Sequence, residues 1–206
     1  MASSSSGSER DNCVYALYRR RRAKARAKVM TLQEYFDTPE TVLPQELIYG
    51  AMRVAESPTS THQETVGALY IALHEQVQRR LLGTVWLAPL DVVLDAERAL
   101  VIQPDLFVLL HGGRAVVLDK VEGPPDLVIE VLSPRPRIGD VVERLGWFRE
   151  YGVRECWLVE PLARRIQVLR FEGGELKCRL SFESHDRIVS TLLPDLDLSL
   201  ESILGY

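Results

Sequence analysis

The sequence is poor in cysteine and has no long apolar run. The 206 residues include only Cys13, Cys156 and Cys178, an odd and scattered set. This pattern fits reduced thiols and lacks the spacing of a zinc site, and Cys156 is best interpreted as a core residue. No apolar stretch is long enough to span a membrane, and no apolar signal region follows the N-terminal charges. We therefore expect a soluble cytoplasmic protein without membrane contact.

The chain is also poor in lysine, and its charge is uneven. Residues 1–30 carry eight basic residues against two acidic ones, a net charge of +6; because the whole chain is −4, residues 31–206 carry −10. Lys120 and Lys177 are the only lysines of that acidic part. With 46% hydrophobic and 26% charged residues, the chain can build one good core but not two large domains. An acidic domain is not a general nucleic-acid-binding surface.

Residues 1–30 form a segment of their own. A Ser/Gly run leads into an arginine-rich stretch that has too few apolar residues to order by itself. We predict a basic, disordered arm that either binds phosphate or is a tail from a start site placed too far upstream, the second being favoured. Met30 makes a natural domain start, because Thr31 can cap a short helix and Glu34 can complete its capping box. The folded domain is predicted at residues 31–206.

The first half of this domain predicts a hairpin, a helix and two strands. Residues 45–54 are typical of a hairpin that turns near Gly50. From His62 onward the apolar residues recur at helical spacing, which predicts an amphipathic helix that ends before Gly83. Residues 84–94 are then expected to form a strand, and within residues 100–110 another apolar strand follows Pro104-Asp105.

Residues 126–132 predict a strand that is buried on both faces, yet Glu130 stands in its middle. A buried carboxylate is costly unless a cation, a metal ion or a proton accompanies it. Two prolines end this strand. Asp140 is expected to open a helix that Gly152 closes, and residues 155–159 form another short apolar strand. A hairpin at residues 165–182 and a helical turn near the C-terminus follow.

Two carboxylates on apolar strands stand out. Asp105 and Glu130 are 25 residues apart, and adjacent strands would bring them to one point. Two neighbouring carboxylates repel, so one is protonated or a divalent cation lies between them. Oxygen ligands suit magnesium or manganese, and such an ion can activate water to attack a phosphodiester. Taken alone, Asp105 after Pro104 also fits a simple turn.

The order of these motifs resembles a large family of predicted bacterial endonucleases, abundant in cyanobacteria and Deinococcus-like bacteria. The similar segments are Pro104-Asp105, Ile129-Glu130-Val131-Leu132-Ser133-Pro134, Asp140 with its helix, Tyr151-Gly152-Val153 and Glu155-Cys156-Trp157-Leu158-Val159. The resemblance covers about residues 31–200. It implies an α/β (α+β) restriction-endonuclease-like fold of the PD-(D/E)xK superfamily, with a central mixed β-sheet flanked by helices.

The resemblance also implies an activity and a site. The expected protein is a metal-dependent endonuclease that hydrolyses phosphodiester bonds in nucleic acid, with DNA favoured over RNA, and it forms a homodimer or higher oligomer. Asp105 and Glu130 would ligate Mg²⁺ or Mn²⁺, and Glu46 would lie near the same pocket. Glu46 also fits an ordinary charge on an edge strand.

The catalytic lysine of the family is the point of departure. The position two residues after Glu130 is Leu132, and the helix position that usually carries a lysine is Arg144. Arginine cannot take a proton from water, but its planar fork can hold a phosphate or a carboxylate. An ion pair between Asp140 and Arg144, four residues apart, is the competing interpretation. The alternative function is therefore a degenerate module that binds nucleic acid or a protein without cleavage.

Four further residues have weaker claims on the site. Arg135 and Arg137 flank the turn after the Glu130 strand, where they could reach a phosphate, although solvated loop charges are the favoured interpretation. His62 is a possible substrate contact, but it fits a helix-start or packing residue better than a base. Lys120 is far from every motif position, so it is only a distant candidate to replace the missing lysine. Trp147 and Phe148 are expected to pack in the core rather than to stack on bases.

Overall fold

The structure is a computed structural model that describes residues 29–39, 44–55, 57–133 and 138–205. The predicted arm lies outside these ranges apart from Val29 and Met30, as do Arg135 and Arg137. Within the described ranges no helix has the length and apolar character needed to cross a bilayer.

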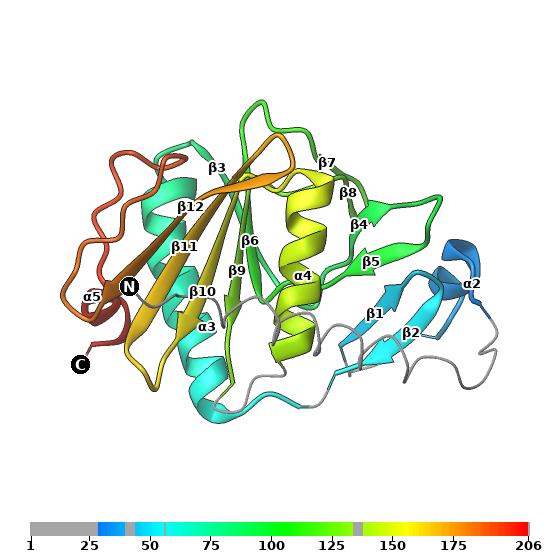
Figure 1. The fold of residues 1–206 in the computed structure, drawn as a ribbon, viewed down its shortest axis with the longest axis horizontal. Coiled ribbons are helices and arrows are strands. Elements are labelled where there is room, and N and C mark those ends of the chain that lie inside the picture. The colour runs from blue at the N-terminus through cyan, green and yellow to red at the C-terminus, as the bar shows by residue number, and fades with distance from the viewer. Residues whose placement is uncertain (1–28, 40–43, 56, 134–137, 206) are drawn as a thin grey trace, which may run out of the picture.

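A six-stranded sheet forms the centre of the fold, in the order β12-β11-β10-β9-β6-β3 (Figure 1). The β9–β10 pair is parallel and the other pairs are antiparallel, so the sheet is mixed, as predicted. Its strands are β3 (Gly83–Leu87), β6 (Leu106–Leu110), β9 (Leu127–Val131), β10 (Glu155–Glu160), β11 (Arg165–Glu172) and β12 (Glu175–Glu183).

A second sheet, in the order β2-β1-β5-β4-β8-β7, lies beside the first. Its strands are β1 (Gln45–Ile48), β2 (Ala51–Val54), β4 (Val92–Asp95), β5 (Leu100–Ile102), β7 (Val116–Val117) and β8 (Val121–Glu122). The predicted hairpin at residues 45–54 is confirmed. Its two turn residues, Tyr49 (φ 51°) and Gly50 (φ 80°), both have the positive φ that a tight hairpin turn requires.

The strand predicted at residues 84–94 is divided between the two sheets as β3 and β4, so that prediction was wrong in its bounds. Residues 100–110 are divided in the same way: residues 100–102 form β5, and the strand predicted after Pro104-Asp105 is confirmed as β6. Pro89 and Pro104 lie in the breaks, where a residue without an N–H cannot continue a ladder. The chain therefore crosses from one sheet to the other at these points, and Asp105 is placed just before β6.

Helices cover both faces of the central sheet: α3 (Ser60–Leu73), its π-helical continuation η1 (His74–Gln78) and α5 (Leu200–Leu204) lie on one face, and α4 (Ile138–Tyr151) lies on the other. The short helix α2 (Leu32–Phe36) packs instead against β1, β4 and β5 of the second sheet. Thr31 caps α2 and Glu34 completes the capping box, as predicted. Asp140, however, does not open α4, because the helix already begins at Ile138 and Asp140 belongs to its first turn. Gly152, at φ 90°, follows the last helical residue, as predicted.

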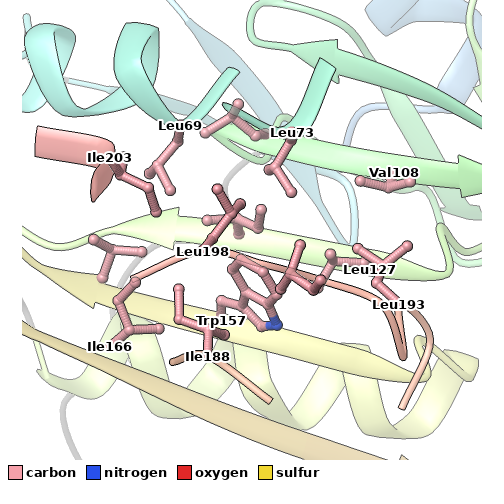
Figure 2. Close-up of a cluster of buried hydrophobic side chains, with 14 of the residues drawn as sticks. Leu69, Leu73, Val108, Leu127, Trp157, Ile166, Ile188, Leu193, Leu198 and Ile203 are labelled. Carbon is pink, nitrogen blue, oxygen red and sulfur yellow. The ribbon is translucent and has the colours of Figure 1, made fainter. Parts of the chain in front are cut away.

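The core has one layer on each face of the central sheet. Leu69 and Leu73 of α3 and Ile203 of α5 pack over Trp157 on one face (Figure 2). On the other face α4 contributes Trp147 and Phe148, which are buried core residues, as predicted. Each fully buried leucine or phenylalanine contributes roughly 1.5–3 kcal/mol. This packing fixes α4 against β9, which is the contact that builds the site below.

Candidate active site

The register of β6 against β9 brings Asp105 and Glu130 together. Leu106 pairs with Ile129 in an antiparallel ladder, so Asp105, one residue before β6, lies beside Glu130. The Asp105 carboxylate accepts a hydrogen bond from the backbone N–H of Val131 at 2.8 Å. The predicted meeting of the two acids is thus seen in the structure, and it follows from backbone pairing alone.

His62 approaches Asp105 from the start of α3. Thr59 caps this helix by accepting from the His62 backbone N–H, which places the imidazole in the first turn. Its Nε2 lies 3.1 Å from Asp105 Oδ2. Nδ1 is buried and has no hydrogen-bond partner among the described residues. The hydrogen bond to Asp105 raises the pKa of His62, and burial opposes this effect.

Arg144 of α4 bridges Glu130 and Glu46. Its Nε and Nη2 donate to Glu130 Oε1 at 3.0 and 2.7 Å, and its Nη1 donates to Glu46 Oε1 at 2.6 Å. Both sheets therefore contribute an acid to one guanidinium, since Glu46 belongs to β1 and Glu130 to β9. The ion pair considered between Asp140 and Arg144 is not what the structure shows; Arg144 points to the sheets instead.

Burial and like charge dominate the electrostatics of this cluster. Burial raises the pKa of Glu130 to about 7; Arg144 opposes the shift, and the charges of Asp105 and Glu46 add to it. For Arg144, burial acts to lower the pKa, but Glu130 and Glu46 together hold it above its ordinary value. Two carboxylates thus share one permanent cation with Asp105 close by, and burial, followed by the neighbouring negative charges, accounts for the high pKa of Glu130.

The donor set fits a hard divalent cation in its chemistry. Asp105 and Glu130 lie beside each other, and among the described residues no hydrogen bond is donated to Asp105 Oδ1 or Glu130 Oε2. Carboxylate oxygens are the ligands that magnesium and manganese prefer. No group of three or more His, Cys, Asp or Glu side chains in the described ranges is arranged to hold a metal ion. Any ion here would complete its shell with water or other oxygens.

Gln103 is a site residue that the sequence argument missed. Its backbone N–H donates to Glu46 Oε1 at 2.8 Å, and its side chain donates to Asp91 at 2.9 Å and accepts from the Gln45 N–H at 3.2 Å. Gln103 thereby holds β1 against the segment that carries Asp105. Its place directly before Pro104-Asp105 was the only available signal.

Lys120 and Arg53 both make contacts outside the acidic site. Lys120 lies with its ammonium 2.7 Å from the centroid of the Phe36 ring, and no contact with the acidic site is found for it among the described residues. Arg53 of β2 pairs with Glu143 of α4 at 2.9 Å and lies over Trp147. The hairpin β1–β2 is therefore fastened to α4 by two separate arginines, Arg53 and Arg144.

These features define an α/β protein of the restriction-endonuclease-like class, in which two acidic side chains lie beside each other where two strands pair. The sequence profile of the Uma2 family, described as "Putative restriction endonuclease", matches residues 32–201. The chain belongs to this family. No curated protein matches the sequence.

A solved structure shows the same fold. It is the crystal structure of a "putative nuclease belonging to DUF820" from Anabaena variabilis ATCC 29413, with a TM-score of 0.70 and 20% sequence identity. The match covers 85% of this chain and 98% of that one. The predicted fold class and family are thereby confirmed.

Proposed function

We propose that this protein is a metal-dependent endonuclease that hydrolyses phosphodiester bonds in nucleic acid, with DNA as the expected substrate. The observation that carries the proposal is the convergence of Asp105, Glu130 and Arg144 at the junction of β6, β9 and α4. Membership of the Uma2 family supports nuclease chemistry. Assembly into a homodimer or higher oligomer stays a prediction.

Asp105 and Glu130 are the residues proposed to hold Mg²⁺ or Mn²⁺. When bound, such an ion supplies a Lewis acid that lowers the pKa of water and neutralises phosphate charge. Two contacts fix the position of the Asp105 carboxylate: the backbone N–H of Val131 and the His62 side chain both contact its Oδ2. Glu46 adds a further negative charge that favours a cation.

Arg144 is proposed to orient the acids and to stabilise charge on the substrate. Three of its five N–H groups donate to Glu130 and Glu46. The remaining two donate to no acceptor among the described residues, and we propose that they donate to a phosphate oxygen, where a fixed guanidinium stabilises developing negative charge. Because arginine stays protonated, it does not act as a base. A group other than Arg144 must therefore remove the proton from water.

The direct test is cleavage of supercoiled plasmid, single-stranded DNA and RNA in magnesium or manganese. Glu130→Ala and Asp105→Ala are expected to abolish cleavage, while Glu97→Ala, an exposed acid in a turn of the second sheet, leaves it unchanged. Metal-dependent cleavage that persists at the wild-type rate in Glu130→Ala would sink the proposal.

A second candidate is a module that binds nucleic acid or a protein without cutting. It is favoured by Arg144, whose charge is shared with two carboxylates at the helix position where the family resemblance implies a lysine. Arg144→Lys separates the two functions. A large gain in cleavage by Arg144→Lys would show that the site is intact and lacks only a base. Cleavage by the wild-type protein would rule out the second candidate.

A further inference from the structure

A basic groove lies at the other end of α4 from the acidic site. It has a volume of about 690 Å³ and is formed by the end of α4, the start of β10, the β11–β12 turn and residues 191–192. In Figure 1 the β11–β12 turn lies next to the end of α4. Five cations and two carboxylates line it, in a domain whose net charge is −10. The five cations are Arg114, Arg149, Arg154, Arg170 and Lys177.

Arg114 is built into the wall of this groove. Its Nη2 donates to the carbonyls of Tyr151 and Gly152 at 3.3 and 2.6 Å, at the negative end of the helix dipole. A Cβ at position 152 would collide with this guanidinium, so the glycine there leaves it space as well as allowing φ 90°. No carboxylate in the described part of the chain pairs with Arg114.

Two further arginines carry charge that the protein leaves incompletely paired. Arg149 on the last turn of α4 is exposed and has no ion-pair partner among the described residues. Arg170 lies 3.7 Å from the buried carboxylate of Glu155, yet its buried Nε donates to no described group. The other two cations are neutralised locally, because Arg154 pairs with Asp126 and Lys177 with Glu175.

We propose that this groove binds the phosphate backbone of the nucleic acid at a distance from the scissile bond. The inference rests on the proposed function, because the ligand is the substrate of the nuclease. Guanidinium groups recognise phosphate oxygens through paired N–H donors. A domain of net charge −10 needs a local excess of positive charge to hold a polyanion, and the groove supplies it.

The position of the groove sets the length of substrate that can use it. Arg144 and Arg149 are five residues apart on α4, which corresponds to roughly 7.5 Å along the helix axis. One nucleic-acid strand places a phosphate about every 3.4 Å of axis. A strand cut at Asp105 and Glu130 must therefore extend more than about two nucleotides beyond the cut to reach Arg149.

The test measures binding of a fluorescein-labelled 20-base-pair DNA duplex to full-length protein in EDTA, on a Glu130→Gln background that prevents cleavage. Arg149→Gln removes one groove cation, and Arg79→Gln is the matched control. Arg79 is an exposed arginine that follows η1, on the opposite face of the central sheet. Losing one phosphate contact is expected to weaken binding about eightfold at 0.1 M salt and to reduce the salt slope by about 0.9.

The double variant Arg149→Gln/Arg114→Gln, which removes two cations without a carboxylate partner among the described residues, is expected to bind on the order of fiftyfold more weakly. Unchanged affinity and salt slope in Arg149→Gln would overturn the proposal. So would tighter binding of polyglutamate than of duplex at the groove, which would assign it to an acidic protein.

Cleavage assays separate this inference from the proposed function. If wild-type protein cleaves DNA and Arg149→Gln leaves KM for a 20-base-pair substrate unchanged, the groove proposal fails and the nuclease stands. If no variant cleaves but Arg149→Gln weakens binding, the nuclease fails and the groove stands. A cleaved substrate with only two nucleotides beyond the cut should be insensitive to Arg149→Gln.

Discussion

A carboxylate shielded from most solvent lies near each end of β9, buried at Asp126 and largely buried at Glu130, and the two accept hydrogen bonds in different ways. Asp126, before the strand, uses both oxygens: Oδ2 accepts from the Leu110 N–H at 2.8 Å and Oδ1 from Arg154 at 3.2 Å. Glu130, inside the strand, uses one oxygen for two N–H groups of Arg144. Burial alone therefore does not distinguish the two acids. They differ in that Glu130, unlike Asp126, has one carboxylate oxygen that accepts no hydrogen bond among the described residues.

The charge around the two ends is also reversed. At the Glu130 end, one buried guanidinium serves several carboxylates, so negative charge is in excess. At the Asp126 end, several arginines surround two buried carboxylates, Asp126 and Glu155, so positive charge reaches the surface. The first arrangement suits a cation and the second an anion.

The strongest test of this comparison exchanges each acid for its amide. Glu130→Gln should lower cleavage about 10²–10³-fold, the usual cost of one charge-stabilising group, with little loss of stability. Asp126→Asn should leave the rate per folded molecule unchanged but lower the free energy of unfolding by about 1–3 kcal/mol, because a charged hydrogen-bond acceptor is lost. Initial rates and urea unfolding measure both. Equal effects of the two variants on rate would break the distinction.

Removal of the shared cation should be the most destabilising change. Arg144→Ala leaves Glu130 and Glu46 facing each other without a guanidinium, which typically costs about 3–5 kcal/mol for a buried pair. Urea unfolding in EDTA measures this loss. Magnesium should restore part of it in Arg144→Ala, and the recovery should vanish in Arg144→Ala/Asp105→Ala. Arg144→Ala with wild-type stability would show that the bridge is not formed.

The metal-free protein should lose stability as pH rises. Glu130 binds its proton up to about pH 7 in the folded state, against an ordinary value of 4.5, so folding takes up a proton between these values. The raised pKa of His62 acts in the same sense, because its contribution is complete below 6.5 and is lost at higher pH. Urea unfolding from pH 5 to 8 should therefore show a falling free energy. Glu130→Gln should show a flatter profile, and an identical profile would contradict the assignment.

The smallest effect is expected at the second fastening of the hairpin. Arg53→Ala removes a partly exposed ion pair with Glu143 and a contact with Trp147, for a loss of about 1 kcal/mol. Thermal unfolding measures this change, with Arg79→Ala as an exposed control. A loss as large as that of Arg144→Ala would mean that the two fastenings are equivalent.

Local patterns predicted most of the elements and both central acids. The helical spacing after His62, the glycines near the hairpin turns and the apolar run around Glu130 each carry their own physical reason, and each element is present. The meeting of Asp105 with Glu130 needed only the assumption that their strands are adjacent. That assumption holds in the β6–β9 ladder.

Partners from distant parts of the chain could not be predicted in the same way. Asp140, four residues from Arg144, offered a local ion pair, whereas the actual partner Glu46 lies 98 residues away. Likewise, nothing in residues 84–94 or 100–110 showed that each segment would divide between two sheets. Such pairings depend on how the sheets pack, and a sequence pattern does not record that packing.

The long-range bridge through Arg144 also bears on how the protein is made. Glu46, Asp105 and Glu130 leave the ribosome before Arg144 does, so a growing chain holds the acids without the cation that allows them to be buried together. Docking of the hairpin onto the central sheet must wait for α4. The acidic cluster therefore stays without its guanidinium until at least 144 of the 206 residues have been synthesised.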